Sequence, residues 1–116
     1  MNTAKLFGIK NCDTVKKARR WLDGHNIEYH FVDFKQQPPS SEAVQTWISA
    51  LGADKLLNKR STTWKSLSDA EKAQAEGRGL PALICDHPTL IKRPVLQVNQ
   101  DYWVGFSEAS YTSIFT

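Results

Sequence analysis

The order of apolar and polar residues predicts a strand, a helix and a second strand at the start of the chain. Residues 4–9 are mostly apolar and few in number, which is typical of a buried strand. Between residues 13 and 24, apolar residues recur at helical spacing with lysine and arginine on the other face, and Gly24 stands where this helix would end. Residues 29–34 alternate and are rich in aromatic side chains, as in a strand. Because a helix connects them, we expect the two strands to be parallel.

The middle of the chain predicts helices and no convincing strand. Pro38-Pro39 interrupts the pattern, and Ser40-Ser41-Glu42 is a typical helix start. The elements expected from there on are a helix ending at Gly52, a short turn at 55–57, a polar loop at 60–64, a helix from Ser68 to about Gly77, and a short helix at 80–85. Residues from about 38 to 86 are therefore predicted to form a helical insert.

The last part of the chain predicts a hairpin and a terminal helix. Residues 95–98 and 102–106 have strand patterns and are separated by Asn99-Gln100-Asp101. Ser107 marks the start of the last helix. The predicted order is βαβ, helices, ββα, which makes this an α/β protein, and the length suits a single domain over residues 1–116.

Composition and charge narrow the expected partners. Hydrophobic residues make up 41% and charged residues 23% of the sequence, as is ordinary for a globular protein. The formal net charge is +3 and the positive residues are dispersed, so we expect no nucleic-acid partner. No apolar run reaches the roughly 20 residues that cross a membrane, and residues 1–5 lack the layout of a signal peptide. We therefore expect a cytoplasmic monomer with no membrane partner.

Cys12 lies between the first predicted strand and the first predicted helix. At a helix N-terminus, unpaired backbone N–H groups and the positive end of the helix dipole favour the thiolate, which is the nucleophilic form of cysteine. Lys10, Lys16 and Lys17 add positive charge nearby, while Asp13 opposes it. Position alone leaves open the alternative that Cys12 is a small buried apolar residue.

The second cysteine, Cys85, lies far along the chain from Cys12. The third residue after Cys12 is Val15, so there is no C-x-x-C motif, and the histidines and cysteines lack metal-ligand spacing. We therefore expect a reduced protein with one reactive thiol and no metal site. Cys85 stands beside Leu83 and Ile84, and we predict a structural, buried role for it.

Three segments together resemble one family. FGIKNCDT at residues 7–14 resembles the N-terminal cysteine motif of the arsenate reductase-like (ArsC/Spx) family, which also includes Spx-type transcription regulators and YffB-type glutathione-dependent reductases. HPTLIKRP at residues 87–94 resembles the family's second signature, a His-Pro followed by Arg-Pro. LLNKRSTTW at residues 56–64 is most similar to the YffB-type group. The resemblance runs from residue 4 to residue 115 and implies a thioredoxin/glutaredoxin-like fold.

The resemblance implies roles for particular residues. Cys12 matches the family's nucleophile, and Arg60 and Arg93 match arginines that face it. Guanidinium groups stabilise negative charge that develops near a sulfur and bind oxyanions or carboxylates through two hydrogen bonds. Pro94 matches the cis-proline beside the catalytic sulfur of thioredoxin-like folds. A cis X–Pro bond exposes backbone groups that can pair with a peptide-like ligand such as glutathione.

The resulting hypothesis is a glutathione-dependent thiol–disulfide oxidoreductase that uses a single nucleophilic cysteine. Glutathione is expected as a co-substrate, with no bound cofactor, and the other substrate as a small disulfide or an oxyanion. The residues expected to bind substrate or glutathione are Lys10, Asn11, Thr14, Arg60, Arg93 and Pro94. Thr14 has an alternative role as the cap of the helix.

Two alternatives stay open. Arsenate reduction would use the same nucleophile, but in glutathione-coupled arsenate reductases His-Asn-Pro precedes the cysteine, where this chain has residues 8–11, and an arginine follows the hairpin, where it has Gly105-Phe106. Their first arginine matches Asn58 better than Arg60. The second alternative is a non-enzymatic, Spx-like transcription regulator that binds a protein partner. Spx-type proteins generally carry a C-x-x-C switch, which Val15 excludes here.

Overall fold

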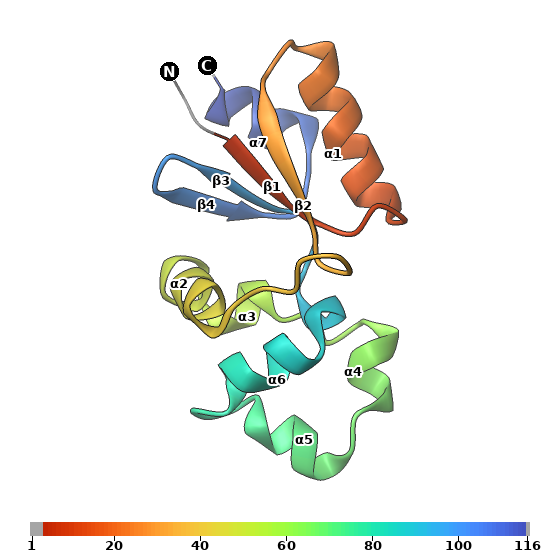
Figure 1. Ribbon diagram of the computed structural model, residues 1–116, viewed down its shortest axis with the longest axis vertical. Coiled ribbons are helices and arrows are strands. Elements are labelled where there is room, and N and C mark those ends of the chain that lie inside the picture. The colour runs from red at the N-terminus through yellow and green to blue at the C-terminus, as the bar shows by residue number, and fades with distance from the viewer. Residues whose placement is uncertain (1–3, 116) are drawn as a thin grey trace. The chain divides into compact units, whose positions relative to one another are not determined.

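The computed structural model describes residues 4–115, and the expectation for the first residues of the chain falls partly on residues 1–3, outside this range. The chain divides into two compact units. The first unit contains residues 4–36 and 93–115, and the second contains Gln37–Lys92. In Figure 1 the first unit comprises the red and orange elements at the start of the chain and the blue elements at its end. Each unit is described by itself below.

The described residues of the first unit form a four-stranded sheet in the order β2-β1-β3-β4. The strands are β1 (Ala4–Gly8), β2 (Tyr29–Asp33), β3 (Val95–Val98) and β4 (Asp101–Val104). β1 pairs in parallel with β2 and antiparallel with β3, and β3 pairs antiparallel with β4. The predicted α/β class and the parallel pairing of the first two strands are confirmed.

The hairpin differs in detail from its prediction. Val98 pairs with Asp101, so the turn contains only Asn99 and Gln100, and Asn99 takes a positive φ of 56°. β4 ends at Val104 because Gly105 turns the chain with a φ of 83°, a conformation that favours glycine. The strand predicted over residues 102–106 therefore starts one residue after the observed strand starts and ends two residues after the observed strand ends.

Two helices pack on one face of this sheet. They are α1 (Asp13–Gly24) and α7 (Glu108–Ile114), both near their predicted positions. The buried side chains of this core come from alternate strand positions and from the helices: Ala4, Leu6, Ala18, Leu22, Leu96, Val98 and Tyr111. Burial of each large apolar side chain contributes about 1.5–3 kcal/mol, so this face carries most of the stability of the unit.

Gly8, at the end of β1, lets α1 approach the sheet closely. A Cβ atom built on Gly8 would lie 2.8 Å from Cγ2 of Val15, which is fully buried in the first turn of α1. That distance is shorter than real Cβ contacts, so a side chain here displaces the start of the helix. The glycine therefore sets the distance between β1 and the helix that Cys12 precedes.

We expect Gly8→Ala to lower the free energy of unfolding by about 1–3 kcal/mol, the usual cost of overpacking a core. Gly24→Ala is the matched control, because a Cβ on Gly24 meets nothing within 4 Å and alanine favours helix. Urea denaturation of both variants measures the difference. Equal stability of the two variants contradicts the role given to Gly8.

The second unit is helical. Its elements are α2 (Ser41–Leu51), α3 (Ala53–Leu56), α4 (Thr62–Ser66), α5 (Asp69–Gln74), α6 (Leu80–Asp86) and the 3-10 helix η1 (Pro88–Leu90). Ser40, Ser61 and Ser68 cap α2, α4 and α5 by accepting a backbone N–H with their hydroxyl groups. The prediction of a polar loop over 60–64 is wrong in its second half, because the Ser61 cap starts a short helix there.

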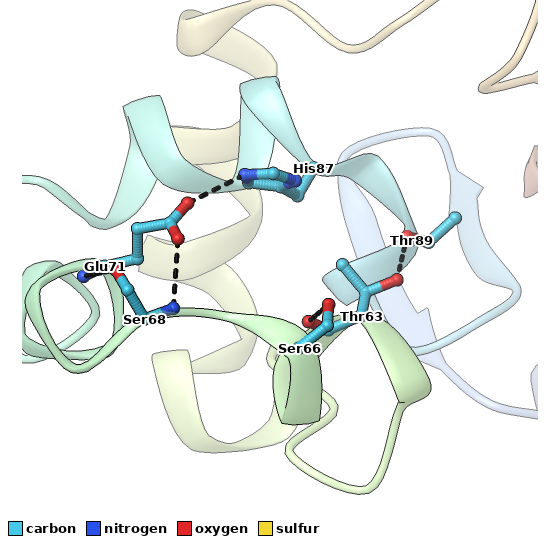
Figure 2. Close-up of polar contacts among 6 residues, drawn as sticks. All are labelled: Thr63, Ser66, Ser68, Glu71, His87 and Thr89. Atoms are coloured by element: carbon cyan, nitrogen blue, oxygen red, sulfur yellow. Dashed lines mark hydrogen bonds and ion pairs between the residues drawn. The ribbon is translucent and has the colours of Figure 1, made fainter.

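Figure 2 shows how the segment that contains the second signature holds two of these helices. Nε2 of His87 lies 3.3 Å from a carboxylate oxygen of Glu71 in α5. Glu71 also accepts the backbone N–H of Ser68 at 3.0 Å and completes a capping box at the start of α5. The hydroxyl group of Thr89 hydrogen-bonds to that of Thr63 in α4. His87 and Thr89 are thus structural contacts between η1 and its neighbours.

The Glu71 contacts predict an effect of pH on stability. The hydrogen bonds from Ser68 and the nearby His87 lower the pKa of Glu71 below its ordinary value of 4.5. A carboxyl group whose pKa is lowered in the folded state stabilises the protein above its ordinary pKa, and this contribution is lost as pH falls through the lowered value. We expect Glu71→Gln to reduce the loss of stability between about pH 5 and pH 3, followed by urea unfolding. Glu76→Gln, at an exposed neighbouring position, is the control and should leave the profile unchanged.

Candidate functional site

Cys12 occupies the N-cap position of α1. Its backbone is extended, with φ −139° and ψ 124°, and its carbonyl oxygen accepts the N–H of Lys16 at 2.9 Å. In the described part of the chain its side chain makes no capping hydrogen bond. The residue is half-buried. Cys12 therefore stands at the N-terminus of a 12-residue helix, which is the positive end of the helix dipole.

The register of the sheet brings further segments to the end where β1 leads to Cys12 (Figure 1). Gly8 pairs with Asp33, the last residue of β2, and Phe7 pairs with Val95, the first residue of β3. Arg93 and Pro94, which directly precede β3, therefore enter the sheet at this same end. The pairing places two segments of the family motifs, far apart in sequence, next to each other.

The Arg93–Pro94 peptide bond is cis, as predicted. Pro94 is buried and its carbonyl oxygen accepts the N–H of Gly105 at 2.9 Å, which connects this segment to the end of β4. Arg93 is half-buried. The described residues therefore hold the backbone of Arg93 and Pro94 in place from the β4 side as well as through β3.

Lys10, Asn11 and Thr14 surround Cys12 in sequence. Lys10 and Asn11 are exposed and Thr14 is half-buried. The alternative role of Thr14 as the helix cap is wrong, because Cys12 itself holds the N-cap position. Between residues 4 and 115, no side-chain hydrogen bond joins Cys12 to any of these three residues. They remain predicted binding residues.

Asp33 is a residue at this end of the sheet that sequence reasoning missed. Its side chain is 9% exposed, and its Oδ1 accepts the backbone N–H of Lys35 at 2.9 Å. The N–H of Phe34 donates to the carbonyl oxygen of Gly8 at 2.8 Å. These bonds keep the chain close to β1 where β2 ends. Only the register between β1 and β2 could have pointed to Asp33, since its own sequence neighbourhood reads as an ordinary strand end.

Arg60 belongs to the second unit and lies in the turn before α4. Its backbone N–H donates to Oδ1 of Asn58 at 3.1 Å, and its side chain is exposed. The turn is anchored on both sides, because Asn58 N–H donates to the carbonyl oxygen of Leu90 at 2.7 Å and the Ser61 hydroxyl donates to the Asn58 carbonyl at 2.8 Å. Arg60 thus extends from a well-defined turn, and its role beside Cys12 stays a prediction.

Cys85 lies in α6 and is half-buried, less enclosed than predicted. Burial raises the pKa of its thiol, and the negative charge of Asp86 raises it further. Both effects favour the protonated form, which is a poor nucleophile. The environment of Cys85 is therefore the opposite of the one expected at a helix N-terminus.

The described residues contain neither a metal-binding cluster nor a membrane-spanning helix. No group of three or more His, Cys, Asp or Glu side chains there could hold a metal ion. None of the helices between residues 4 and 115 is long and apolar enough to span a bilayer.

Comparison with known proteins identifies the family. The family model described as the ArsC family matches residues 7–114, and the chain belongs to this family. An uncharacterized protein of Haemophilus influenzae is 38% identical over 110 residues, which cover 95% of this chain and 96% of that protein. A solved structure described as a YffB protein is 36% identical, with a TM-score of 0.89, over 97% of this chain and 99% of that one. The global transcriptional regulator Spx 2 of Oceanobacillus iheyensis is 29% identical over 108 residues, covering 91% and 78% of the two chains.

These matches confirm the resemblance to the arsenate reductase-like family and its thioredoxin-like α/β fold. The arsenate reductase-like members of this family are oxidoreductases, whereas its Spx members are regulators. Membership alone thus leaves two classes of function.

The contrast between the two cysteines gives a direct test of the site. We expect iodoacetamide at neutral pH to alkylate Cys12 faster than Cys85 by about tenfold or more, because burial and Asp86 raise the pKa of the Cys85 thiol, whereas Cys12 stands at the N-terminus of α1. Peptide mass spectrometry at successive times measures both rates in one sample. Cys12→Ser and Cys85→Ser variants assign the two signals, and equal rates would mean that the helix N-terminus does not activate Cys12.

Proposed function

We propose that the protein is a glutathione-dependent thiol–disulfide oxidoreductase that uses Cys12 as its single nucleophile. The observation that carries this proposal is the position of Cys12, which is half-buried at the start of a 12-residue helix and is not used for capping in the described structure. The cis-Pro94 segment at the same end of the sheet supports it. So does the likeness to the solved YffB protein over nearly the whole chain.

The proposed reaction has two thiol–disulfide exchanges. The Cys12 thiolate attacks the glutathione sulfur of a mixed disulfide between glutathione and a substrate thiol. A Cys12–glutathione disulfide forms, and the substrate leaves as a thiolate that takes a proton from water. A glutathione thiolate then attacks this disulfide, which releases oxidised glutathione and restores the Cys12 thiolate. The net reaction converts one mixed disulfide and one glutathione thiol into one substrate thiol and one molecule of oxidised glutathione, so the free glutathione is the reductant.

The arginines have a proposed role in both steps. Thiol–disulfide exchange spreads negative charge over the sulfur atoms, and a fixed guanidinium group stabilises this charge. Glutathione also carries carboxylates, which arginine binds with two hydrogen bonds. The proposed role of Arg93 is supported by its place at the Cys12 end of the sheet. The proposed role of Arg60 is supported by its match to the family motif.

The first test is incubation with oxidised glutathione, followed by intact-mass measurement. We expect the wild type to gain the mass of one glutathione and Cys12→Ser to gain none, because only Cys12 is predicted to be nucleophilic. Cys85→Ser is the matched control and should react like the wild type. A wild type that forms no adduct would contradict the enzyme hypothesis and direct the search to protein partners.

The second test concerns Arg93. We expect Arg93→Ala to slow the reduction of a glutathione mixed disulfide by about tenfold or more through loss of charge stabilisation, with Arg93→Lys restoring part of the rate. Arg78→Ala, at an exposed position in the second unit, controls for the loss of one positive charge. Melting temperatures of all variants separate a chemical effect from unfolding. Unchanged rates in Arg93→Ala would reduce Arg93 to a structural role, and an arsenate arm of the same assay tests oxyanion reduction.

A second candidate function is an Spx-like regulator that binds a protein partner. The 29% identity with Spx 2 over 91% of this chain favours keeping it. This candidate predicts a complex that persists when Cys12 is replaced by serine, whereas a mixed disulfide with a substrate is lost in that variant. Affinity capture with wild type and Cys12→Ser under reducing and non-reducing conditions distinguishes the two.

A further inference from the structure

A cavity in the first unit lies between α1 and the segment that connects β4 to α7. Its volume is about 630 Å³. α1 contributes Lys17, Arg20, Trp21 and Gly24, and the connecting segment contributes Phe106. This cavity belongs to no step of the proposed thiol chemistry.

The cavity follows one face of α1. Lys17, Arg20, Trp21 and Gly24 take positions i, i+3, i+4 and i+7, so they stand together along one side of the helix. The buried face of α1, represented by Leu22, is a different one. Gly24 has no heavy atom within 4 Å of a built Cβ, so the absence of a side chain there leaves open space in the cavity.

The aromatic walls of the cavity are held in place by neighbouring rings. The Trp21 ring lies edge-on to Tyr111 with centroids 5.6 Å apart, and 5.9 Å from Phe115. His25 stacks on Trp21 at 3.9 Å and its Nδ1 lies 2.8 Å from the Trp21 carbonyl oxygen. Phe106 also lies edge-on to Tyr111, at 4.7 Å. The rings of Trp21 and Phe106 are therefore fixed before any ligand arrives, with His25 covering part of Trp21, and this order lowers the entropy cost of binding.

The charges of the cavity favour an anion. Lys17 and Arg20 are exposed, and neither side chain forms an ion pair within residues 4–115. Glu108 contributes one carboxylate at the first turn of α7, so the two cations outnumber it. A phosphate or carboxylate group is the natural partner for an unpaired lysine and arginine that stand one turn apart.

We propose that this cavity binds a small ligand made of a planar aromatic ring that carries an anionic group. The ring lies against Trp21 and Phe106, and the phosphate or carboxylate lies against Lys17 and Arg20. The volume falls within the range of about 300–1,000 Å³ typical of small-molecule sites. The proposal is independent of the reaction at Cys12, because it uses none of the residues proposed for that reaction.

The test uses three probes that contain no thiol: adenosine 5′-monophosphate, 1-naphthyl phosphate and 2-naphthoate. Titration of isotope-labelled full-length protein is followed by nuclear magnetic resonance. We expect at least one probe to shift the Trp21 indole N–H and the Phe106 amide signals saturably. Adenosine or inorganic phosphate alone should bind at least about fivefold more weakly, because each satisfies only half of the site. Absence of saturable shifts with all three probes overturns the proposal.

Matched variants locate the binding. Arg20→Ala should weaken the best probe by about fivefold, the size of a partly exposed charged contact. Gly24→Leu should abolish binding by filling the cavity, and its open surroundings allow the variant to fold. Lys16→Ala, which removes an exposed cation from the same helix outside the cavity lining, should bind like the wild type. If Lys16→Ala weakens binding as much as Arg20→Ala, or if Gly24→Leu binds normally, the site is not this cavity.

Discussion

The close approach of α1 to β1 at Gly8 is the constraint on which the rest of the thiol site depends. Because Val15 fills the space that a side chain on Gly8 would need, the first turn of the helix lies directly on the end of the strand. Residues 9–12 join these two points, so the position of Cys12 follows from the backbone of both elements. Interactions of its own side chain are not needed to place the sulfur.

The same principle holds for the other segments at this end of the sheet. Pro94 is held by a hydrogen bond between main-chain atoms, from the N–H of Gly105 to its carbonyl oxygen, and Phe34 is held to Gly8 in the same way. Main-chain bonds therefore fix much of the backbone here, with the Asp33 side chain adding one further hydrogen bond. A frame of this kind can carry different chemistry in different relatives, because changes in side chains leave its geometry intact, which fits a family that contains both reductases and regulators.

Much of this architecture could be predicted from the sequence, because its elements have strong local signals. Serine caps marked α2 and α7, terminating glycines marked α1 and α2, and amphipathic spacing marked α1. The start of α4 was missed because Thr62, Thr63 and Trp64 have weak helix propensity, and the Ser61 cap with the Thr63–Thr89 contact outweighs it. The position of Asp33 beside Gly8 depends on the register between β1 and β2, which no local sequence pattern encodes.

The motif HPTLIKRP divides between two tasks in the structure. His87 and Thr89 lie in the helical unit and connect its short helices, whereas Arg93 and Pro94 lead into β3 of the other unit. The sequence resemblance treats HPTLIKRP as a single family signature. The contacts place the first half of the motif among the short helices and the second half at the start of β3.

The cap of α1 has a cost that the other capped helices avoid. The serines that cap α2, α4, α5 and α7 each satisfy a backbone N–H with their hydroxyl group, whereas Cys12 leaves this role unfilled in the described structure. A serine at position 12 would differ from the native residue by one atom and would be the better cap, a gain on the order of 0.5–1 kcal/mol. The protein thus accepts a weaker start to its principal helix in exchange for a sulfur atom at that point. Such a compromise between stability and reactivity agrees with the proposed role of Cys12 as a nucleophile.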